Sequence, residues 1–213
     1  RKCDILFSRN MKTWFVKKKY YIIHNGIDLL SSMPELPKNK KFTFISIGRL
    51  EYVKNQKYLI ELLAKIKNKN VQLKIVGNGS QYTMLKNIIE ENGLNDLVEL
   101  MGFREDVISI LQKSHCLLLP SLREGMPLVL LESGHLKIPI IASFQAINNS
   151  IIEEDEGYVV DLDDFKETML DVMNNYQNAL IKADKFYSKV INKYSLRSCV
   201  QLHEQLYGRM IDQ

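Results

Sequence analysis

Hydrophobic and polar positions follow two alternating patterns from Phe42 onward. Short runs of β-branched and other apolar residues predict buried strands, and the segments between them repeat their apolar positions with a helical period. Strands are predicted at 42–47, 71–76, 97–101, 116–119 and 138–142, and helices at 56–68, 80–92, 105–113 and 127–136. This alternation predicts an α/β fold in which helices join the parallel strands of a doubly wound sheet.

Local signals mark the ends of the second helix. Ser80 is its predicted N-cap and Gly93 its stop, because serine accepts a free backbone amide and glycine tolerates the left-handed conformation that ends helices. Past Gly157 the pattern is helical, with helices predicted at 163–175, 179–193 and 196–210. The sheet is therefore expected to be complete before this point, and the remainder of the chain to be helical.

Polar and glycine-rich loops follow four successive predicted strands. Gly48 and Arg49 follow the first strand, Gly77 and Gly79 the second, Arg104 the third and Glu124 the fourth. Ligands of doubly wound sheets bind at the carboxyl ends of the strands. We expect these four loops to converge on one cleft.

The fourth loop leads into a helix whose first amides are predicted to be free. The apolar run 115–119 ends at Pro120, Gly125 permits a tight turn, and Pro127 stands where the first helical turn begins. The amides of Leu128 and Val129, at the positive end of the helix dipole, then form a seat for an anion such as phosphate.

Two glutamates flank this anion seat. Glu124 lies in the loop before the helix, and Glu132 lies past the first turn, with its side chain leaning back toward the helix start. Carboxylates accept hydrogen bonds from ribose and hexose hydroxyls, and a diphosphate fits the helix end between them. The arrangement describes a nucleotide sugar. The alternative for Glu132 is an ordinary glutamate on a helix surface.

Two cations in the first loop suit the same ligand. Arg49 and Lys54 follow a buried strand, where they can neutralise a diphosphate without a metal ion. We expect no cofactor and no metal. The alternative is a pair of surface charges.

Other candidate residues are less specific. Gly77 and Gly79 do not form a dinucleotide fingerprint, because Tyr82 occupies its third glycine position; they fit a backbone turn near phosphates or a plain strand-to-helix turn. Arg104 is a candidate neighbour of the nucleobase. His24, His115 and His135 have no partners at ligand or triad spacing and are interpreted as structural.

Four motifs in order carry a resemblance to a known family. They are Glu124-x7-Glu132 within Pro120-Ser-Leu-Arg-Glu-Gly-Met-Pro-Leu-Val-Leu-Leu-Glu, Gly48-Arg-Leu-Glu-Tyr-Val-Lys-Asn55, Val76-Gly-Asn-Gly79, and His24-Asn-Gly-Ile-Asp28. Together they resemble the retaining GT-B glycosyltransferases of family 4, the glycosyl transferases group 1, over nearly the whole chain. The expected fold is then Rossmann-like, the C-terminal half of a GT-B fold with C-terminal helices.

The resemblance implies a division of roles within the site. It places Gly48, Gly77, Gly79, Arg104, Gly125, Met126, Pro127, Leu128, Val129 and Glu132 against the nucleotide sugar, and Glu124, Arg49 and Lys54 in catalysis. Glu124 then orients and stabilises the sugar rather than acting as a nucleophile, since retaining enzymes of this type react on one face of the sugar.

The chain departs from the family pattern at two places. Lys137 replaces the glycine that ends the helix after Glu132, a position where lysine is less well tolerated. Phe144 and Gln145 stand where the family often has an acidic residue and glycines. The second departure bears on which donor sugar is bound.

Length and resemblance predict the domain organisation. A chain of 213 residues holds one substantial core, too little for both halves of a GT-B enzyme. We expect residues 1–33 to be a remnant of an N-terminal domain and an interdomain linker, 34–193 to be the donor-binding domain, and 194–213 to be a C-terminal crossover helix. A chain lacking the acceptor-binding domain is expected to transfer sugar poorly.

Composition indicates the cellular compartment and the kinds of partner to expect. The chain is 46% hydrophobic and 25% charged, has a net charge of +4 and contains three widely spaced cysteines, which suits a reducing cytosol better than a disulfide scaffold. Lysine clusters at 17–19 and 38–41 are either solvated charge or an attraction to the inner face of the membrane. They lack the interleaved aromatic residues of a nucleic-acid interface, so nucleic acid is not an expected partner.

These observations predict a glycosyltransferase that moves a sugar, with retention, from a nucleotide diphosphate sugar to a hydroxyl acceptor. UDP-sugar is the favoured donor, with GDP- and ADP-sugars as alternatives. The resemblance suggests bacterial surface polysaccharide synthesis and a glycan or lipid-linked acceptor held by the absent N-terminal domain. The alternatives are a non-catalytic nucleotide-binding or interaction module and a GT-B sugar-nucleotide epimerase.

Overall fold

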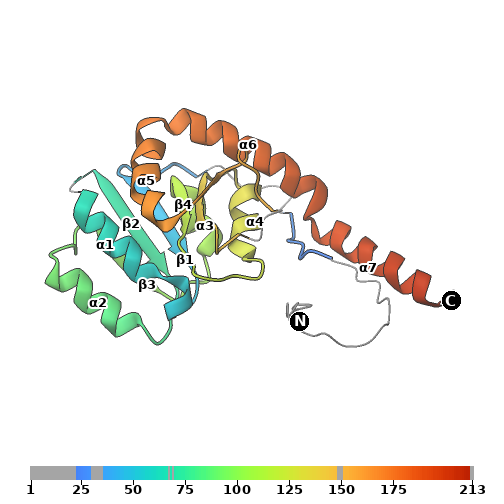
Figure 1. Ribbon diagram of the computed structural model, residues 1–213, viewed down its shortest axis with the longest axis horizontal. Helices are drawn as coiled ribbons and strands as arrows, with labels where there is room; N and C mark the ends of the chain where they lie inside the picture. The colour runs from blue at the N-terminus through green and yellow to red at the C-terminus, as the bar shows by residue number, and fades with distance from the viewer. Residues whose placement is uncertain (1–22, 30–35, 67, 69, 148–150, 212–213) are drawn as a thin grey trace.

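The computed structural model describes residues 23–29, 36–66, 68, 70–147 and 151–211. A six-stranded parallel sheet forms its centre, in the order β3-β2-β1-β4-β5-β6 (Figure 1). The strands are β1 Phe42–Ile47, β2 Val71–Val76, β3 Val98–Gly102, β4 Cys116–Leu119, β5 Ile140–Ser143 and β6 Tyr158–Val160. This order is that of a doubly wound sheet, so the predicted α/β Rossmann-like fold is confirmed.

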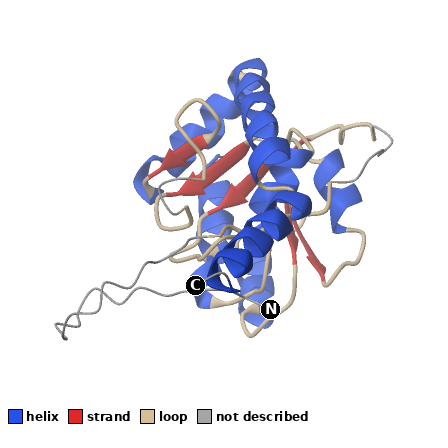
Figure 2. Cartoon of the chain, turned by 90° about the vertical axis from the view of Figure 1, so that its right-hand side faces the viewer, coloured by secondary structure: helices blue, strands red, loops and turns tan. Residues whose placement is uncertain are grey.

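Helices cover both faces of the sheet, as the strands enclosed between helices in Figure 2 show. The helices are α1 Gln56–Ile66, α2 Tyr82–Glu91, α3 Val107–Lys113, α4 Leu128–His135, α5 Phe165–Asn174, α6 Tyr176–Lys193 and α7 Leu196–Ile211, with 3-10 turns η1 Tyr52–Lys54 and η2 Leu162–Asp164. Apolar residues of α1, α2 and α5 pack in one core cluster, and those of α3, α4 and most of α6 pack in another.

Neighbouring positions of β1 supply the two cores. Phe44 belongs to the cluster under α1, α2 and α5, whereas Ile45 belongs to the cluster under α3 and α4, and both side chains are fully buried. Successive side chains of a strand point to opposite faces, so a strand buried on both sides is mostly apolar, although β1 also buries Thr43 and Ser46. This explains why the strands read as continuous hydrophobic runs.

Two sequence predictions are wrong in detail. Gln81, not Ser80, is the N-cap of α2, because the Ser80 hydroxyl donates to Glu51 Oε2 at 2.9 Å and ties the loop after β2 to the loop after β1. The segment after Gly157 is not wholly helical, since it begins with β6, a strand of three residues at the sheet edge. Gly93 ends α2 as predicted, with φ +63.

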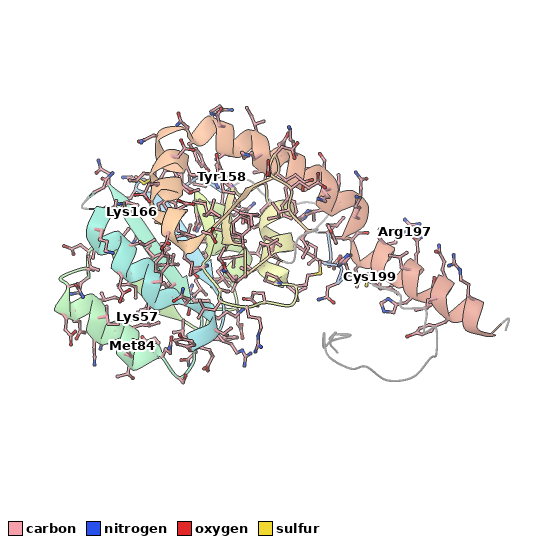
Figure 3. All side chains as sticks on the ribbon, in the orientation of Figure 1. Lys57, Met84, Tyr158, Lys166, Arg197 and Cys199 are labelled. Atoms are coloured by element: carbon pink, nitrogen blue, oxygen red, sulfur yellow. The ribbon has the colours of Figure 1, made fainter. Side chains whose placement is uncertain are left out.

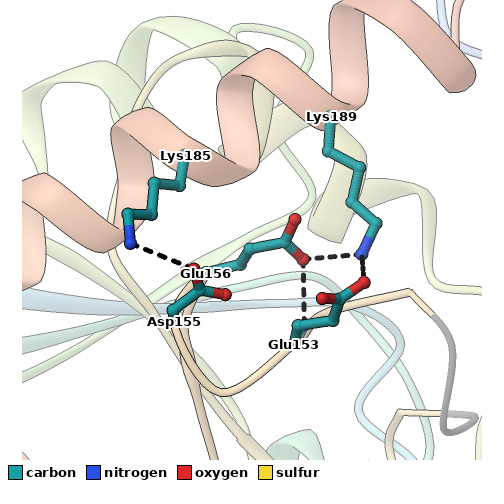
Figure 4. A network of polar contacts seen from close by, with 5 residues as sticks. All are labelled: Glu153, Asp155, Glu156, Lys185 and Lys189. Carbon is teal, nitrogen blue, oxygen red and sulfur yellow. Dashed lines mark hydrogen bonds and ion pairs between the residues drawn. The ribbon is translucent and has the colours of Figure 1, made fainter.

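Lysines of α6 hold the acidic segment between β5 and β6 (Figure 4). Lys189, whose side chain is only 8% exposed, contacts Glu153 at 3.0 Å and Glu156 at 2.7 Å. Lys185 contacts Asp155 at 3.0 Å. These ion pairs fasten the segment before β6 to α6.

The last helix extends away from the sheet (Figure 1). Arg197 and Cys199 lie on it, apart from the side chains that crowd the sheet (Figure 3). At its start Ile27 exchanges backbone hydrogen bonds with Tyr194 and Leu196, which joins the described part of the predicted linker to α7. None of the helices in the described part of the chain is long and apolar enough to cross a membrane. Most of the predicted remnant 1–33 lies outside the described residues.

Candidate functional site

The predicted site lies where the winding of the sheet reverses. From β1 the chain proceeds to β2 and β3 on one side, and β4 and β5 lie on the other, so β1 and β4 border the switch point. The loop of Gly48 to Lys54 follows β1, and the loop of Pro120 to Pro127 follows β4. A crevice outside the carboxyl ends of these two strands is where such folds bind ligands.

The glycines of the first two loops allow the loops to interlock. A Cβ atom on Gly77, which has φ +141, would lie 1.9 Å from the Gly48 carbonyl oxygen. A Cβ on Gly79 would lie 2.5 Å from the Leu50 carbonyl oxygen. The loops are joined by hydrogen bonds from Gly48 N to Val76 O and from Leu50 N to Asn78 O, each 3.0 Å long. Gly77 and Gly79 are therefore required by backbone contact.

The loop after β1 also docks on the loop after β4. Asn55, left-handed at φ 57, ends η1 and donates from Nδ2 to Pro120 O at 3.2 Å. Leu122 N donates to Val53 O at 2.8 Å. This contact places Lys54 Nζ 2.5 Å from Glu124 Oε1, with side-chain exposures of 20% and 12%. Two residues that the sequence assigned to catalysis are thus in direct contact.

Glu124 has further partners that sequence reasoning missed. The Ser121 hydroxyl donates to Glu124 Oε1 at 2.9 Å, and the Ser143 hydroxyl donates to the Ser121 carbonyl oxygen at 2.7 Å. Glu124 N donates to Gln145 O at 3.3 Å. The position of Ser121, three residues before Glu124 in the same loop, is a sequence signal from which its contact with Glu124 could have been predicted. The contacts of Ser143 and Gln145 could not, because they depend on the pairing of β4 with β5.

The start of α4 presents free amides. Pro127 is the N-cap with extended backbone, and the first bond of the helix runs from Leu130 N to Pro127 O at 3.1 Å. The amides of Leu128 and Val129 have no hydrogen-bond acceptor among the described residues. Leu128 is half exposed, so its amide lies near the surface. Gly125 and Met126 lead into this helix start, and its use as an anion seat stays a prediction.

Glu132 is a carboxylate without a cation. It is partly buried on α4 and forms no ion pair with the described residues. Burial raises the pKa of the Glu132 carboxyl. Ionisation of this carboxyl is costly, and the carboxylate has no ion-pair partner among the described residues. Such a group is suited to accept hydrogen bonds from the hydroxyls of a ligand.

The two arginines differ in their surroundings. Arg49 is exposed beside the Gly48 turn, and its guanidinium forms no ion pair with any described residue. Arg104 forms a double contact with Asp106, at 2.8 Å from both Nε and Nη2. Arg49 is therefore available to an anion, whereas Arg104 already has an acidic partner. Its placement beside a nucleobase stays a prediction.

The described histidines have structural contacts. His115 Nδ1 accepts a hydrogen bond from Thr43 N at 3.0 Å, and its ring stacks on Phe42 with centroids 4.7 Å apart. Burial, with Lys38 nearby, lowers the pKa of His115 to about 4. His24 and His135 pack against Tyr194 and Tyr187, respectively.

A hollow of about 540 Å³ lies elsewhere, between the end of α6, the start of α7 and the linker. Its walls include His24, Lys193 and Gln201 and none of the site residues above. The loops at the carboxyl ends of the strands are better supported as the functional site. They hold the Lys54–Glu124 pair, the amides of Leu128 and Val129 and the exposed Arg49, which has no ion-pair partner among the described residues.

Comparison with known proteins identifies a family. The family described as glycosyl transferases group 1 matches residues 31–190. An Escherichia coli UDP-Gal:alpha-D-GlcNAc-diphosphoundecaprenol alpha-1,3-galactosyltransferase is 29% identical over 220 residues, covering 91% of this chain and 55% of the relative. The capsular polysaccharide biosynthesis glycosyltransferase CapH of Staphylococcus aureus is 33% identical over 134 residues, covering 59% of this chain and 37% of the relative.

A solved structure is similar in fold. S. aureus TarM, crystallised in complex with Fondaparinux, alpha-GlcNAc-glycerol and UDP, superposes with a TM-score of 0.74 and 25% identity, covering 88% of this chain and 38% of TarM. This chain thus spans about half the length, or less, of these relatives.

Proposed function

Because the chain belongs to the glycosyl transferases group 1 family, we propose that its sheet domain binds the nucleotide diphosphate sugar donor of a retaining sugar transfer to a hydroxyl acceptor. The observation that carries the proposal is the Lys54–Glu124 ion pair at the switch point, beside the unpaired amides of Leu128 and Val129. Glu124 stands in the loop that leads into this helix start, and Lys54 is in contact with Glu124.

The diphosphate occupies the start of α4 in this proposal. The amides of Leu128 and Val129 donate to its oxygens, and Arg49 and Lys54 neutralise the charge that develops as the phosphate leaves. The exposed guanidinium of Arg49, which has no ion-pair partner among the described residues, supports this role. The charge of these two side chains replaces that of a metal ion, so we expect donor binding to be insensitive to a chelator.

Glu132 and Glu124 bind the two sugars of the donor. Glu132 accepts from the ribose hydroxyls, for which its lack of a cationic partner prepares it. Glu124, held by Lys54 and Ser121, faces the transferred sugar and stabilises an oxocarbenium-like state. The donor phosphate takes the proton of the attacking acceptor hydroxyl on the same face, which retains the configuration at the transferred carbon.

The names of the relatives support the substrate class. UDP-Gal is the donor named for the E. coli relative and UDP is bound in TarM, which favours a uridine nucleotide over GDP or ADP. The acceptor named for the E. coli relative is a diphosphoundecaprenol lipid, and CapH is named for capsular polysaccharide. We therefore assign the protein to surface polysaccharide synthesis, on a glycan or lipid-linked acceptor at the inner membrane face.

Calorimetric titration with UDP, GDP and ADP tests the donor site. Wild type is expected to bind one nucleotide, with or without EDTA, and Arg49→Ala and Glu132→Ala to weaken binding by about ten-fold or more each. Lys57→Ala is the matched control, because Lys57 is an exposed lysine on α1 whose partner is Glu61. Loss of binding in the control as well, or no nucleotide binding by the folded wild type, would favour an interaction module instead.

Incubation with the nucleotide sugar separates transfer from epimerisation. A retaining transferase releases nucleotide in proportion to glycosylated acceptor, whereas an epimerase releases UDP without an acceptor. Acceptor-independent release at the full rate would therefore contradict the proposed transfer.

A further inference from the structure

The hydroxyl of Ser121 differs in its hydrogen-bond acceptor from the hydroxyls of two other buried serines. Ser121 is 1% exposed, and its hydroxyl donates to the carboxylate of Glu124 at 2.9 Å rather than to a backbone carbonyl. Buried Ser114 and Ser133 instead donate to the backbone oxygens of Ile110 and Ile138. A hydroxyl has one proton to donate, so that of Ser121 is committed to Glu124.

Two donors converge on one oxygen of Glu124. Lys54 Nζ and Ser121 Oγ both bind Oε1, at 2.5 and 2.9 Å. Glu124 Oε2 has no hydrogen-bond donor among the described residues. Two contacts on the same oxygen set the rotation of the carboxylate and leave the second oxygen for a ligand. A lysine alone, at the end of a flexible side chain, restricts that rotation less.

Ser121 is itself fixed to the neighbouring loop. Its carbonyl oxygen accepts from the Ser143 hydroxyl at 2.7 Å, and Ser143 Oγ in turn accepts from Ala146 N at 3.2 Å. The Glu124 amide closes the arrangement by donating to Gln145 O. The loop after β5 therefore holds both the serine and the backbone of the glutamate.

We propose that Ser121 is a positioning residue that locks Glu124 with Oε1 toward Lys54 and Oε2 toward the hydroxyls of the transferred sugar. The inference rests on the proposed donor site. Its consequence is selective: Ser121 contributes to recognition of the sugar moiety and not to recognition of the nucleotide, which binds at the start of α4 and to Arg49 and Glu132.

Titration with UDP, UDP-glucose and UDP-galactose tests this separation. Relative to wild type, Ser121→Ala is expected to bind UDP unchanged and the better of the two nucleotide sugars roughly three- to ten-fold more weakly. Ser121→Thr, which keeps the hydroxyl, should restore sugar affinity. Ser114→Ala is the control, because it deletes an equally buried hydroxyl at the other end of β4.

Each outcome has a distinct meaning. Equal weakening of UDP and nucleotide sugar in Ser121→Ala would assign the serine a merely structural role, and unchanged binding of both would remove it from the site; either overturns the inference. If Ser121→Ala does not fold, Ser121→Cys, which has a similar shape but a weak donor, replaces it with the same expectation. Absence of UDP binding by wild type would instead overturn the proposed donor site.

Discussion

Lys54 Nζ lies 2.5 Å from Glu124 Oε1, although the two residues are 70 positions apart in the chain. The pair joins the loops that follow β1 and β4, and both side chains are mostly shielded from water. The cation proposed for the diphosphate and the carboxylate proposed for the sugar therefore neutralise each other. Each also keeps the other's loop in place.

A double-mutant cycle on this pair should show strong coupling. Lys54→Met and Glu124→Gln should each lower the free energy of unfolding by about 1–3 kcal/mol, because each strands a partly buried partner. The double variant should lose less than the sum of the two. Urea unfolding monitored by circular dichroism measures all four proteins.

Ligand binding should separate the two residues. Lys54→Met should weaken binding of UDP, whereas Glu124→Gln should leave UDP affinity unchanged and weaken only a UDP-sugar. Additive losses of stability, or equal losses of UDP affinity in both variants, would contradict the roles assigned here. Lys86→Met, whose partner Glu90 is exposed on α2, is the control for lysine removal.

The features of this candidate site that were predicted from the sequence have local signals. The Gly48 turn, the free amides at the start of α4 and the paired glutamates are properties of short segments and strand ends. The contact of Ser121 with Glu124, the tie from Ser143 and the ion pair of Arg104 depend on side-chain conformations and on which strands are neighbours. Single-sequence periodicity does not encode these.

The errors have similar causes. The strand β6 has three residues and is partly exposed, so it carries too few alternations to distinguish it from a helical pattern. Ser80 has the residue type of an N-cap, but Glu51, 29 positions away, takes its hydroxyl. At Ser80 a tertiary contact overrides a local preference.

Gly77 should be intolerant of any side chain. A Cβ there would lie 1.9 Å from a backbone oxygen of the Gly48 turn, at a φ of +141 that L-residues rarely adopt. Gly77→Ala is expected to lower the free energy of unfolding by roughly 2–4 kcal/mol. Because the Gly48 turn must move, UDP affinity should fall with it. Thermal unfolding and calorimetry measure the two effects.

Gly208 provides the opposite control for this substitution. It lies within α7 with nothing within 4 Å of its Cβ position. Gly208→Ala should therefore stabilise the helix by about 0.5–1 kcal/mol. A Gly77→Ala protein as stable as wild type would show that the loops after β1 and β2 do not interlock.

Substitutions of Lys137 should measure the free-energy cost of a non-glycine residue in the left-handed conformation after α4. Lys137 is left-handed at φ 55, and its Nζ lies 2.6 Å from Asp184 Oδ1 and 4.6 Å from the centroid of the Tyr187 ring. Lys137→Gly relieves about 1 kcal/mol of backbone strain and loses contacts of similar size, so its stability should be close to that of wild type.

Lys137→Ala is the informative partner variant. It retains the strain and loses both contacts, so it should be about 1 kcal/mol less stable than Lys137→Gly. Denaturant unfolding of the two variants measures the difference. Equal stability would mean that the left-handed conformation at this position carries no cost.

Glu132 is expected to lower the free energy of unfolding and to strengthen nucleotide binding. Burial raises its folded-state pKa above the ordinary value, so ionisation of this carboxyl opposes folding at pH values above the raised pKa. That cost falls as the pH drops from the folded-state pKa to the unfolded-state pKa, and it is absent below the latter. Glu132→Gln removes the cost and should therefore be more stable than wild type at neutral pH, with the difference shrinking in acid.

Glu132→Gln should also weaken binding of the nucleotide. A neutral amide accepts ribose hydroxyls less strongly than a carboxylate does, so Glu132→Gln should bind UDP about ten-fold more weakly at neutral pH. In wild type, affinity should decline as the pH falls through the raised pKa of Glu132, and the variant should lack that decline. Calorimetry across this range, with Glu90→Gln on exposed α2 as the control, tests both statements. A variant that loses stability and keeps its affinity would identify Glu132 as a structural residue of α4 rather than a ligand.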